Sequence, residues 1–338
     1  MDKLNVFTSK DLSKLLDIRS SETKFGQHIK LLPASCTNIY EYINALDVDY
    51  IIIGLPEYNN LLTHLSYQNT TYTWDATLKS LINFKINTYL IPHRVLILGS
   101  LNFDKELNKV KTLDLTIDKQ LAKAKKHIAK INKEITHIIY TLKKSGKTPI
   151  IVGGTQNNAY GIIKGCALAL NTPINTLNLS AHTKFKPKKG KHNGNGFIYA
   201  YAEGFLKHYF VFGLHEQTIS NSILKTIQKM KQIHVSTYES IEVKQTTTFK
   251  KELKKVKQTI SGSPFGIQID CNIINSCKAD NTEGFSLKKI KKFIHYFGKR
   301  KGVHYLHIST TDSSINYSNH KGEFITTFII NFMNAHTK

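Results

Sequence analysis

The stretch that decides the fold is residues 148–157, which read TPIIVGGTQN. The apolar run Pro149–Val152 has the length of a buried strand. Gly153 and Gly154 follow it, and they supply the backbone freedom that a tight turn from a strand into a helix requires. This stretch therefore predicts a strand, a turn and a helix.

The same unit recurs on both sides of this stretch, as short apolar runs that alternate with helical patterns. The runs are Val48–Ile53, Val95–Leu98, Pro149–Val152, Ile174–Leu179, Tyr209–Phe212, Ile233–Ser236, Phe265–Asp270 and Val303–Ser309. Several are apolar on both faces, which is typical of parallel strands covered by helices on each side. The alternation predicts a three-layer α/β/α sandwich with a mostly parallel sheet of about eight strands.

Two of the expected helices are especially clear. Between Ile117 and Leu142, apolar residues recur at alternating spacings of four and three, and lysines cover much of the remaining surface. A coiled coil is the competing interpretation, but a pattern that ends at a strand favours a helix packed on a sheet. Gly146 stands where a helix C-terminal cap belongs. A second helix is expected over Ser286–Phe297, and we interpret the lysines on its exposed face as a solvated surface.

Composition excludes several classes of protein. The chain has 338 residues, of which 41% are hydrophobic and 21% charged, so it is neither collagen-like nor disordered. No apolar run approaches the ~18–20 residues that span a bilayer. The four cysteines are scattered without metal or disulfide spacing, and the first residues lack a signal-peptide pattern. A cytoplasmic protein with no membrane partner is therefore expected, folded as one domain over residues 1–338 with residues 1–45 as an N-terminal extension packed on it.

The charge is strongly positive, with 47 Lys and Arg against 24 Asp and Glu, a formal net charge of +23. Such a balance suggests a nucleic-acid partner. However, only Arg19, Arg94 and Arg300 are arginines, and arginine is the residue that favours bidentate contacts to bases and phosphates. We therefore expect no specific nucleic-acid partner, and a nonspecific polyanion-binding protein is kept as one alternative.

Ligand sites of such sheets lie at the carboxyl ends of the strands. Three motifs stand at expected strand ends: Gly153–Asn157 (GGTQN), Ser180–Lys184 (SAHTK) and Asp270–Asn275 (DCNIIN). In order and spacing they resemble the metal motifs of the ureohydrolase family of arginase, agmatinase and formimidoylglutamase, which read GGDHS, DAHxD and DxDxxDP. The resemblance extends from about Val48 onward and includes a Gly-Leu-Pro turn at Gly54–Pro56. It is greatest to a divergent formimidoylglutamase-like branch whose first motif reads GGSQ.

The resemblance implies an arginase-like fold, a homo-oligomer and a centre in which one His and several Asp hold two Mn²⁺ ions that activate a bridging hydroxide. The positions equivalent to these ligands hold only one carboxylate, and one of them holds a lysine. They are Gln156, Ser180, His182, Lys184, Asp270 and Asn272. Two divalent cations beside an ammonium group repel each other strongly at low dielectric. No metal or other cofactor is therefore expected, although a single metal on His182 and Asp270 remains an alternative.

We interpret the chain as a ureohydrolase-family protein that has lost its metal centre and acts in binding or scaffolding. The alternative is residual hydrolysis of an amidine C–N bond, in a substrate of the formiminoglutamate, agmatine or arginine type, with His182 and Asp270 as the candidate catalytic residues. The expected ligand crevice comprises Gln156, Asn157, Ser180, His182, Lys184, Asp270, Asn272 and Thr310.

Plain structural roles compete with this interpretation. His182 can be a hydrogen-bonded structural histidine, and Asp270 can cap a turn. For Lys184 we predict an ion pair or a short water bridge to Asp270, because a buried carboxylate that has lost its cations needs another positive partner. The competing possibility is that Lys184 points into solvent.

Overall fold

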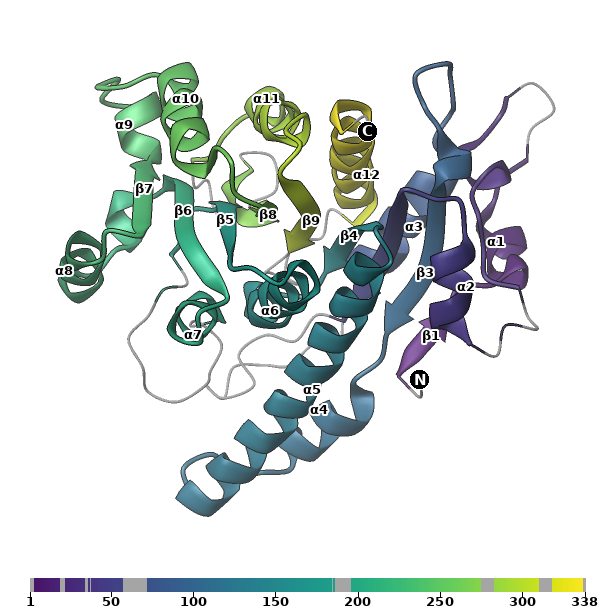
Figure 1. The fold of residues 1–338 in the computed structure, drawn as a ribbon, viewed down its shortest axis with the longest axis horizontal. Coiled ribbons are helices and arrows are strands. Elements are labelled where there is room, and N and C mark those ends of the chain that lie inside the picture. Colours follow the sequence, from purple (N-terminus) through teal and green to yellow (C-terminus); the bar gives the residue numbers. More distant parts are fainter. Residues whose placement is uncertain are drawn as a thin grey trace.

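A computed structural model of the chain describes residues 3–18, 22–33, 36, 38–56, 72–183, 185, 196–274, 283–309 and 318–336. Its described strands form one sheet, and helices lie on both faces of that sheet (Figure 1). The strands are β1 (Leu4–Val6), β2 (Tyr50–Leu55), β3 (Val95–Leu101), β4 (Thr148–Gly153), β5 (Ile174–Leu179), β6 (Leu206–Leu214), β7 (Ile233–Thr237), β8 (Phe265–Asp270) and β9 (Val303–Ser309). The helices of the described ranges are α1 (Ser9–Leu15), α2 (Ile39–Ala45), α3 (Tyr72–Ile82), α4 (Asp104–Lys111), α5 (Asp118–Lys144), α6 (Ala159–Leu170), α7 (Gly196–Ala202), α8 (Asn221–Lys229), α9 (Tyr238–Glu242), α10 (Phe249–Ile260), α11 (Leu287–Gly298) and α12 (Ser318–Ala335).

The strand order is β1-β3-β2-β4-β9-β8-β5-β6-β7. All neighbouring strands run parallel except β1, which pairs antiparallel with β3 at one edge of the sheet. The predicted mostly parallel α/β sandwich is confirmed, with β1 as the strand that the apolar runs did not indicate. Because β1 belongs to the predicted N-terminal extension, that segment adds a strand to the sheet. The boundary at residue 45 and the single-domain assignment stay predictions.

Alternating residues of the strands enter two cores, one on each face of the sheet. Ile52 and Ile97 pack with α3, α10, α11 and α12 on one face. Ile51 and Leu96 pack with α4, α5 and α6 on the other. This is the pattern expected of strands covered by helices on both sides. None of the helices in the described part of the chain is long and apolar enough to span a bilayer.

The two clearest sequence patterns fold as predicted. Helix α5 carries its apolar stripe against the core, and Gly146 after its end has a φ of 75°, the left-handed conformation of a glycine cap. With α4 beside it, α5 projects beyond the sheet (Figure 1). The predicted turn at Gly54–Pro56 begins too early, because β2 continues through Leu55 and Gly54 therefore lies within a strand.

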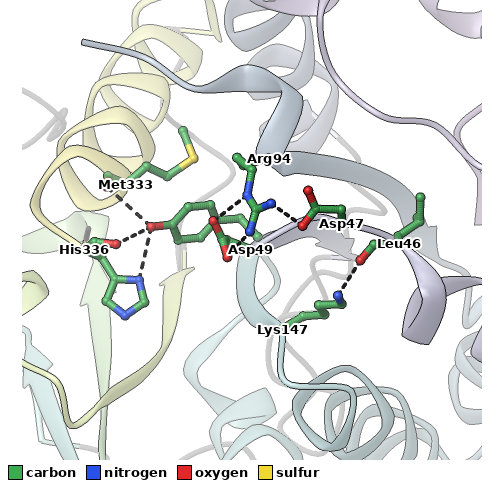
Figure 2. Close-up of polar contacts among 8 residues, drawn as sticks. Leu46, Asp47, Asp49, Arg94, Lys147, Met333 and His336 are labelled. Carbon is green, nitrogen blue, oxygen red and sulfur yellow. Dashed lines mark hydrogen bonds and ion pairs between the residues drawn. The ribbon is translucent and has the colours of Figure 1, made fainter. Parts of the chain in front are cut away.

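The amino ends of β2, β3 and β4 are tied together by polar contacts (Figure 2). Arg94 holds Asp49 with two hydrogen bonds, Nε to Oδ2 and Nη2 to Oδ1, both 2.9 Å, and it also pairs with Asp47. The Lys147 ammonium donates to the Leu46 carbonyl at 2.5 Å. These contacts join segments that are about 45 to 101 residues apart in the chain.

A further contact at this end anchors the residue that follows α12. The buried Tyr50 hydroxyl donates to the carbonyl oxygen of His336 at 2.5 Å, and the His336 ring nitrogen Nδ1 lies 3.2 Å from the same hydroxyl. This contact fixes the end of α12 against the start of β2, on the face of the sheet that α3 also covers.

Candidate functional site

The predicted motifs meet at the carboxyl ends of four adjacent strands, β4, β9, β8 and β5. Gln156 follows β4, Ser180 follows β5, and Asp270 is the last residue of β8. Since parallel strands end at the same edge of a sheet, these three residues are brought together although up to 114 positions separate them in the sequence.

The turn after β4 directs Gln156 into the protein. Gly153 and Gly154 have φ values of 85° and 64°, and a Cβ on Gly154 would lie 2.0 Å from the Asn158 amide nitrogen. Only glycine fits this conformation and this space. Thr155 then caps the short 3₁₀ helix Gln156–Asn158 by accepting a hydrogen bond from the Asn157 backbone N–H at 3.3 Å.

The Gln156 side chain is buried, with 1% of its surface exposed, and its amide is already engaged. Its Nε2 donates to Asn178 Oδ1 at 2.9 Å. Asn178, in the interior of β5, in turn donates from Nδ2 to the Tyr209 hydroxyl at 2.8 Å. The first-motif residue therefore belongs to a chain of neutral hydrogen bonds that links β4, β5 and β6.

Asp270 is fully buried, and two neutral groups donate hydrogen bonds to its carboxylate. Its Oδ1 accepts from the Asn272 backbone N–H at 3.1 Å, which caps the 3₁₀ helix Cys271–Ile273. Its Oδ2 lies 3.3 Å from the Ser180 hydroxyl, which shares its proton between this carboxylate and the carbonyl oxygen of His182 at 2.9 Å. The His182 backbone N–H donates back to Ser180 Oγ at 3.2 Å, so Ser180 closes the turn after β5 and also contacts the end of β8.

The described part of the site thus contains Gln156, Ser180, Asp270 and Asn272 in the places that the motifs indicated. The side chains of His182 and Asn157 are half-buried beside them. Lys184 and Thr310 lie outside the described residues, so the predicted Lys184–Asp270 contact stays a prediction.

Beneath the strand ends lies a second polar chain that the motif comparison missed. The Tyr305 hydroxyl lies 3.3 Å from the Thr176 hydroxyl and accepts from Gln268 Nε2 at 3.1 Å. The Gln268 side-chain amide lies 3.3 Å from His307 Nδ1, and His307 Nε2 donates to the Gly153 carbonyl at 3.2 Å. This buried polar chain, Thr176–Tyr305–Gln268–His307–Gly153, crosses β5, β8, β9 and β4.

Burial determines the protonation of the buried polar chain. All four of its side chains are fully buried. Loss of water lowers the pKa of His307 to about 4 and raises the pKa of Tyr305. His307 is therefore a neutral ring at pH 7, and the backbone carbonyl of Gly153 accepts its N–H. The sequence signal was available, since Asn178, Gln268 and His307 are polar residues inside otherwise apolar strands.

The donor set does not fit the two-manganese centre that the motif resemblance implies. Mn²⁺ favours carboxylate and imidazole ligands, and two ions need several negative charges nearby. At the family ligand positions that the structure describes, Asp270 is the one carboxylate and His182 the one imidazole, while the Gln156 amide is bonded to Asn178. Within the described ranges, no three His, Cys, Asp or Glu side chains come close enough to hold a metal ion.

Comparison with known structures places this architecture among ureohydrolase folds. A formimidoylglutamase from Bacillus subtilis matches with a TM-score of 0.72 at 14% identity, over 94% of this chain and 93% of that one. A Trypanosoma cruzi formiminoglutamase solved with two Mn²⁺ matches with a TM-score of 0.67 at 12% identity, over 94% and 100%. A hypothetical agmatinase from Burkholderia thailandensis matches with a TM-score of 0.60 at 14% identity, over 85% and 86%. At such identities these matches show a common fold.

Sequence comparison gives the family. A search of curated proteins finds no significant match. The model of the Arginase family matches residues 92–303, which span the region from just before β3 to the start of β9 and contain Gln156, His182 and Asp270. This match covers more than half of the chain, and the chain therefore belongs to the arginase family.

Proposed function

We propose that this arginase-family protein has lost manganese-dependent hydrolysis and acts in binding or scaffolding, with the crevice at the carboxyl ends of β4, β5 and β8 as its ligand site. The observation that supports this most is the state of Asp270. Neutral donors, the Ser180 hydroxyl and the Asn272 N–H, occupy both oxygens of this carboxylate. Asp270 is the one carboxylate at the family ligand positions that the structure describes, which is too little negative charge to hold two divalent cations.

The other ligand positions support the same proposal through their charge. Ser180 and Asn272 replace two acids of the family motifs with neutral groups, and Lys184 replaces a third with a cation. A neutral cluster costs less to bury than unpaired carboxylates do, so these replacements are mutually consistent. The crevice is then suited to a neutral or anionic ligand rather than to a pair of divalent cations.

The direct test is hydrolysis in the presence of Mn²⁺. Purified protein is incubated with arginine, agmatine or formiminoglutamate, and released urea, formamide or ammonia is measured beside a His182→Ala variant. We expect the two proteins to give the same background. Mn²⁺-dependent product formation clearly above that of His182→Ala would contradict the proposal and would favour the residual amidine hydrolase, with His182 and Asp270 as its catalytic residues.

Metal binding gives a second readout that does not depend on choosing the right substrate. Titration calorimetry with Mn²⁺ should show no tight binding to the native chain. Lys184→Asp should increase the affinity, because it removes a cation and adds a ligand at a family position. The matched control is Lys207→Asp, which makes the same charge change at an exposed lysine on β6. An equal gain in both variants would mean that net charge, rather than the site, governs the binding.

A further inference from the structure

The solvent side of α11 carries a row of lysines on the outside of one helical layer. Helix α11 contains four lysines and no acid among its 12 residues, and Lys299 follows it directly. Four of these five lysines are exposed, and we call them the lysine stripe: Lys288, Lys291, Lys292 and Lys299. Because their spacings of three, one and seven residues return to the same side of a helix, the stripe runs along α11 for about 16 Å.

The lysine stripe borders a shallow hollow of about 720 Å³. Phe249 and Lys250 of α10 line this hollow from one neighbouring helix, and Asn331 of α12 lines it from the other. Figure 1 shows α11 between α10 and α12 in this layer. The sequence pattern alone indicates a solvated face, and the structure adds to it a hollow that three helices border.

Acidic side chains of the described chain do not offset the charge of the stripe. Among the described residues, none of its four lysines has an ion-pair partner, and no Asp or Glu lines the hollow. Lys289, on the flank of α11, pairs with Glu242. At the ends of α10 and α11, Lys257, Arg300 and Lys301 line a second hollow, again without an acid of the described part of the chain. The positive surface therefore continues past the end of α11.

The apolar and aromatic side chains beside the stripe do not form one surface. Leu287 and Tyr296 are nine residues apart, so they lie on opposite sides of α11 with the lysines between them. An amphipathic helix would therefore find no continuous apolar surface to cover. The exposed His295 lies within the stripe and the half-buried Tyr296 lies beside it, so two rings stand next to the lysines.

Charge and shape together favour a single strand of nucleic acid as the occupant. Its backbone carries a negative charge at every nucleotide and can follow the stripe, and its bases can stack on rings that stand beside the lysines. A helix that reads a duplex enters the major groove, whereas α11 is packed between two other helices and does not protrude. Lysine also lacks the planar fork with which arginine reads bases, so these contacts carry no sequence information.

We propose that the lysine stripe of α11 binds single-stranded nucleic acid without sequence preference. The lysines contact successive phosphates, and the rings of His295 and Tyr296 stack with bases. This surface lies on the outside of the helical layer and uses none of the family ligand positions, so it is independent of the proposed function.

The test is the binding of a labelled oligothymidine to the full chain, followed by fluorescence anisotropy at several salt concentrations. Each phosphate contact contributes about 0.7 to the slope of log affinity against log salt. Lys288→Gln/Lys292→Gln/Lys299→Gln should therefore reduce this slope by about 2 and weaken binding about tenfold or more at low salt. Tyr296→Leu should weaken binding severalfold with the slope unchanged, because it removes a ring and no charge.

The matched control is Lys123→Gln/Lys126→Gln/Lys130→Gln, which removes the same charge from exposed lysines of α5. It should keep the native slope and affinity. An equal loss in both triple variants would overturn the proposal, because it would show attraction by net charge alone. Polyglutamate that displaces the oligothymidine equally well per charge would also overturn it. So would tighter binding of a duplex of the same length, or of vesicles that contain phosphatidylserine, through the same lysines.

Discussion

At the amino ends of the parallel strands Arg94 and two aspartates join the segments, whereas at the carboxyl ends most of the described polar contacts are made by neutral groups, with the Asp270 carboxylate among them. Arg94 with Asp49 and Asp47, at the edge of solvent, joins β3 to the segment before β2. Gln156, Asn178 and the buried polar chain, in contrast, make their hydrogen bonds in full burial. The difference follows the environment, since charges are tolerated where water remains and are costly where it is excluded.

The two ends of the strands also differ in their relation to the candidate site. The amino-end contacts fix segments far apart in the chain, and none of the family ligand positions lies among them. The carboxyl end holds those ligand positions that the structure describes. A change of function within this family is therefore expected to alter the carboxyl end and to leave the amino-end contacts in place.

The largest expected effect comes from crowding the buried polar chain. A Cβ on Gly266 would lie 1.9 Å from Tyr305 Cζ, so Gly266→Ala must displace this ring and break its hydrogen bonds. We expect the free energy of unfolding to fall by about 4 kcal/mol, as for severe overpacking with loss of buried hydrogen bonds. Urea denaturation measures it. Gly146→Ala, where only the positive φ opposes a side chain, should cost about 1 kcal/mol. Near-native stability of Gly266→Ala would mean that the ring has room to move.

Acid should weaken the carboxyl end next. The pKa of His307 is about 4 in the folded protein against 6.5 in the unfolded chain, so the unfolded chain takes up a proton first as the pH falls. This contribution to stability is intact above pH 6.5 and is lost progressively down to about pH 4, by about 3 kcal/mol. His304, whose pKa burial also lowers to about 4, adds to the same slope.

The check is a series of urea denaturation curves between pH 7 and pH 4. His307→Gln should flatten the pH dependence, and the exposed His93→Gln should keep it. An unchanged slope in His307→Gln would rule out this histidine as a source of the acid sensitivity.

A smaller effect is expected at the amino end. Asp49→Ala removes the bidentate partner of Arg94 and should lower the free energy of unfolding by about 2 kcal/mol, in the range of charge-assisted hydrogen bonds. Asp47, whose side chain is 87% exposed, is the matched control. Asp47→Ala should cost less than about 0.5 kcal/mol. Equal effects of the two variants would show that burial does not distinguish these two ion pairs.

The smallest effect tests the contact that anchors the end of α12. Tyr50→Phe removes the hydroxyl that donates to the His336 carbonyl and should cost about 1 kcal/mol in the free energy of unfolding. Tyr89→Phe, at an exposed tyrosine, should leave the thermal midpoint unchanged. If Tyr50→Phe also left it unchanged, this hydrogen bond would contribute nothing to stability.

The sequence predicted the layers and most strands because short β-rich runs such as Ile174–Leu179 and Phe265–Asp270 alternate with helical patterns, and these two match the observed strands residue for residue. It missed β1, since Leu4–Val6 is too short for a pattern and is held by pairing with β3. Nor did it place Gln156 against Asn178, because hydrogen bonds between two strands depend on strand order, which local patterns do not encode. Motif position correctly brought Ser180 and Asp270 together.

Because β9 lies between β4 and β8, a nascent chain on the ribosome carries two half-sheets that it cannot yet join. His307 of β9 is synthesised 154 residues after Gly153 of β4. At translation rates of about 5–20 residues per second this interval is roughly 8–30 s. During that time the edge of β4 has no neighbour and is open to pairing with other chains. Slow synthesis therefore prolongs the exposure of this edge.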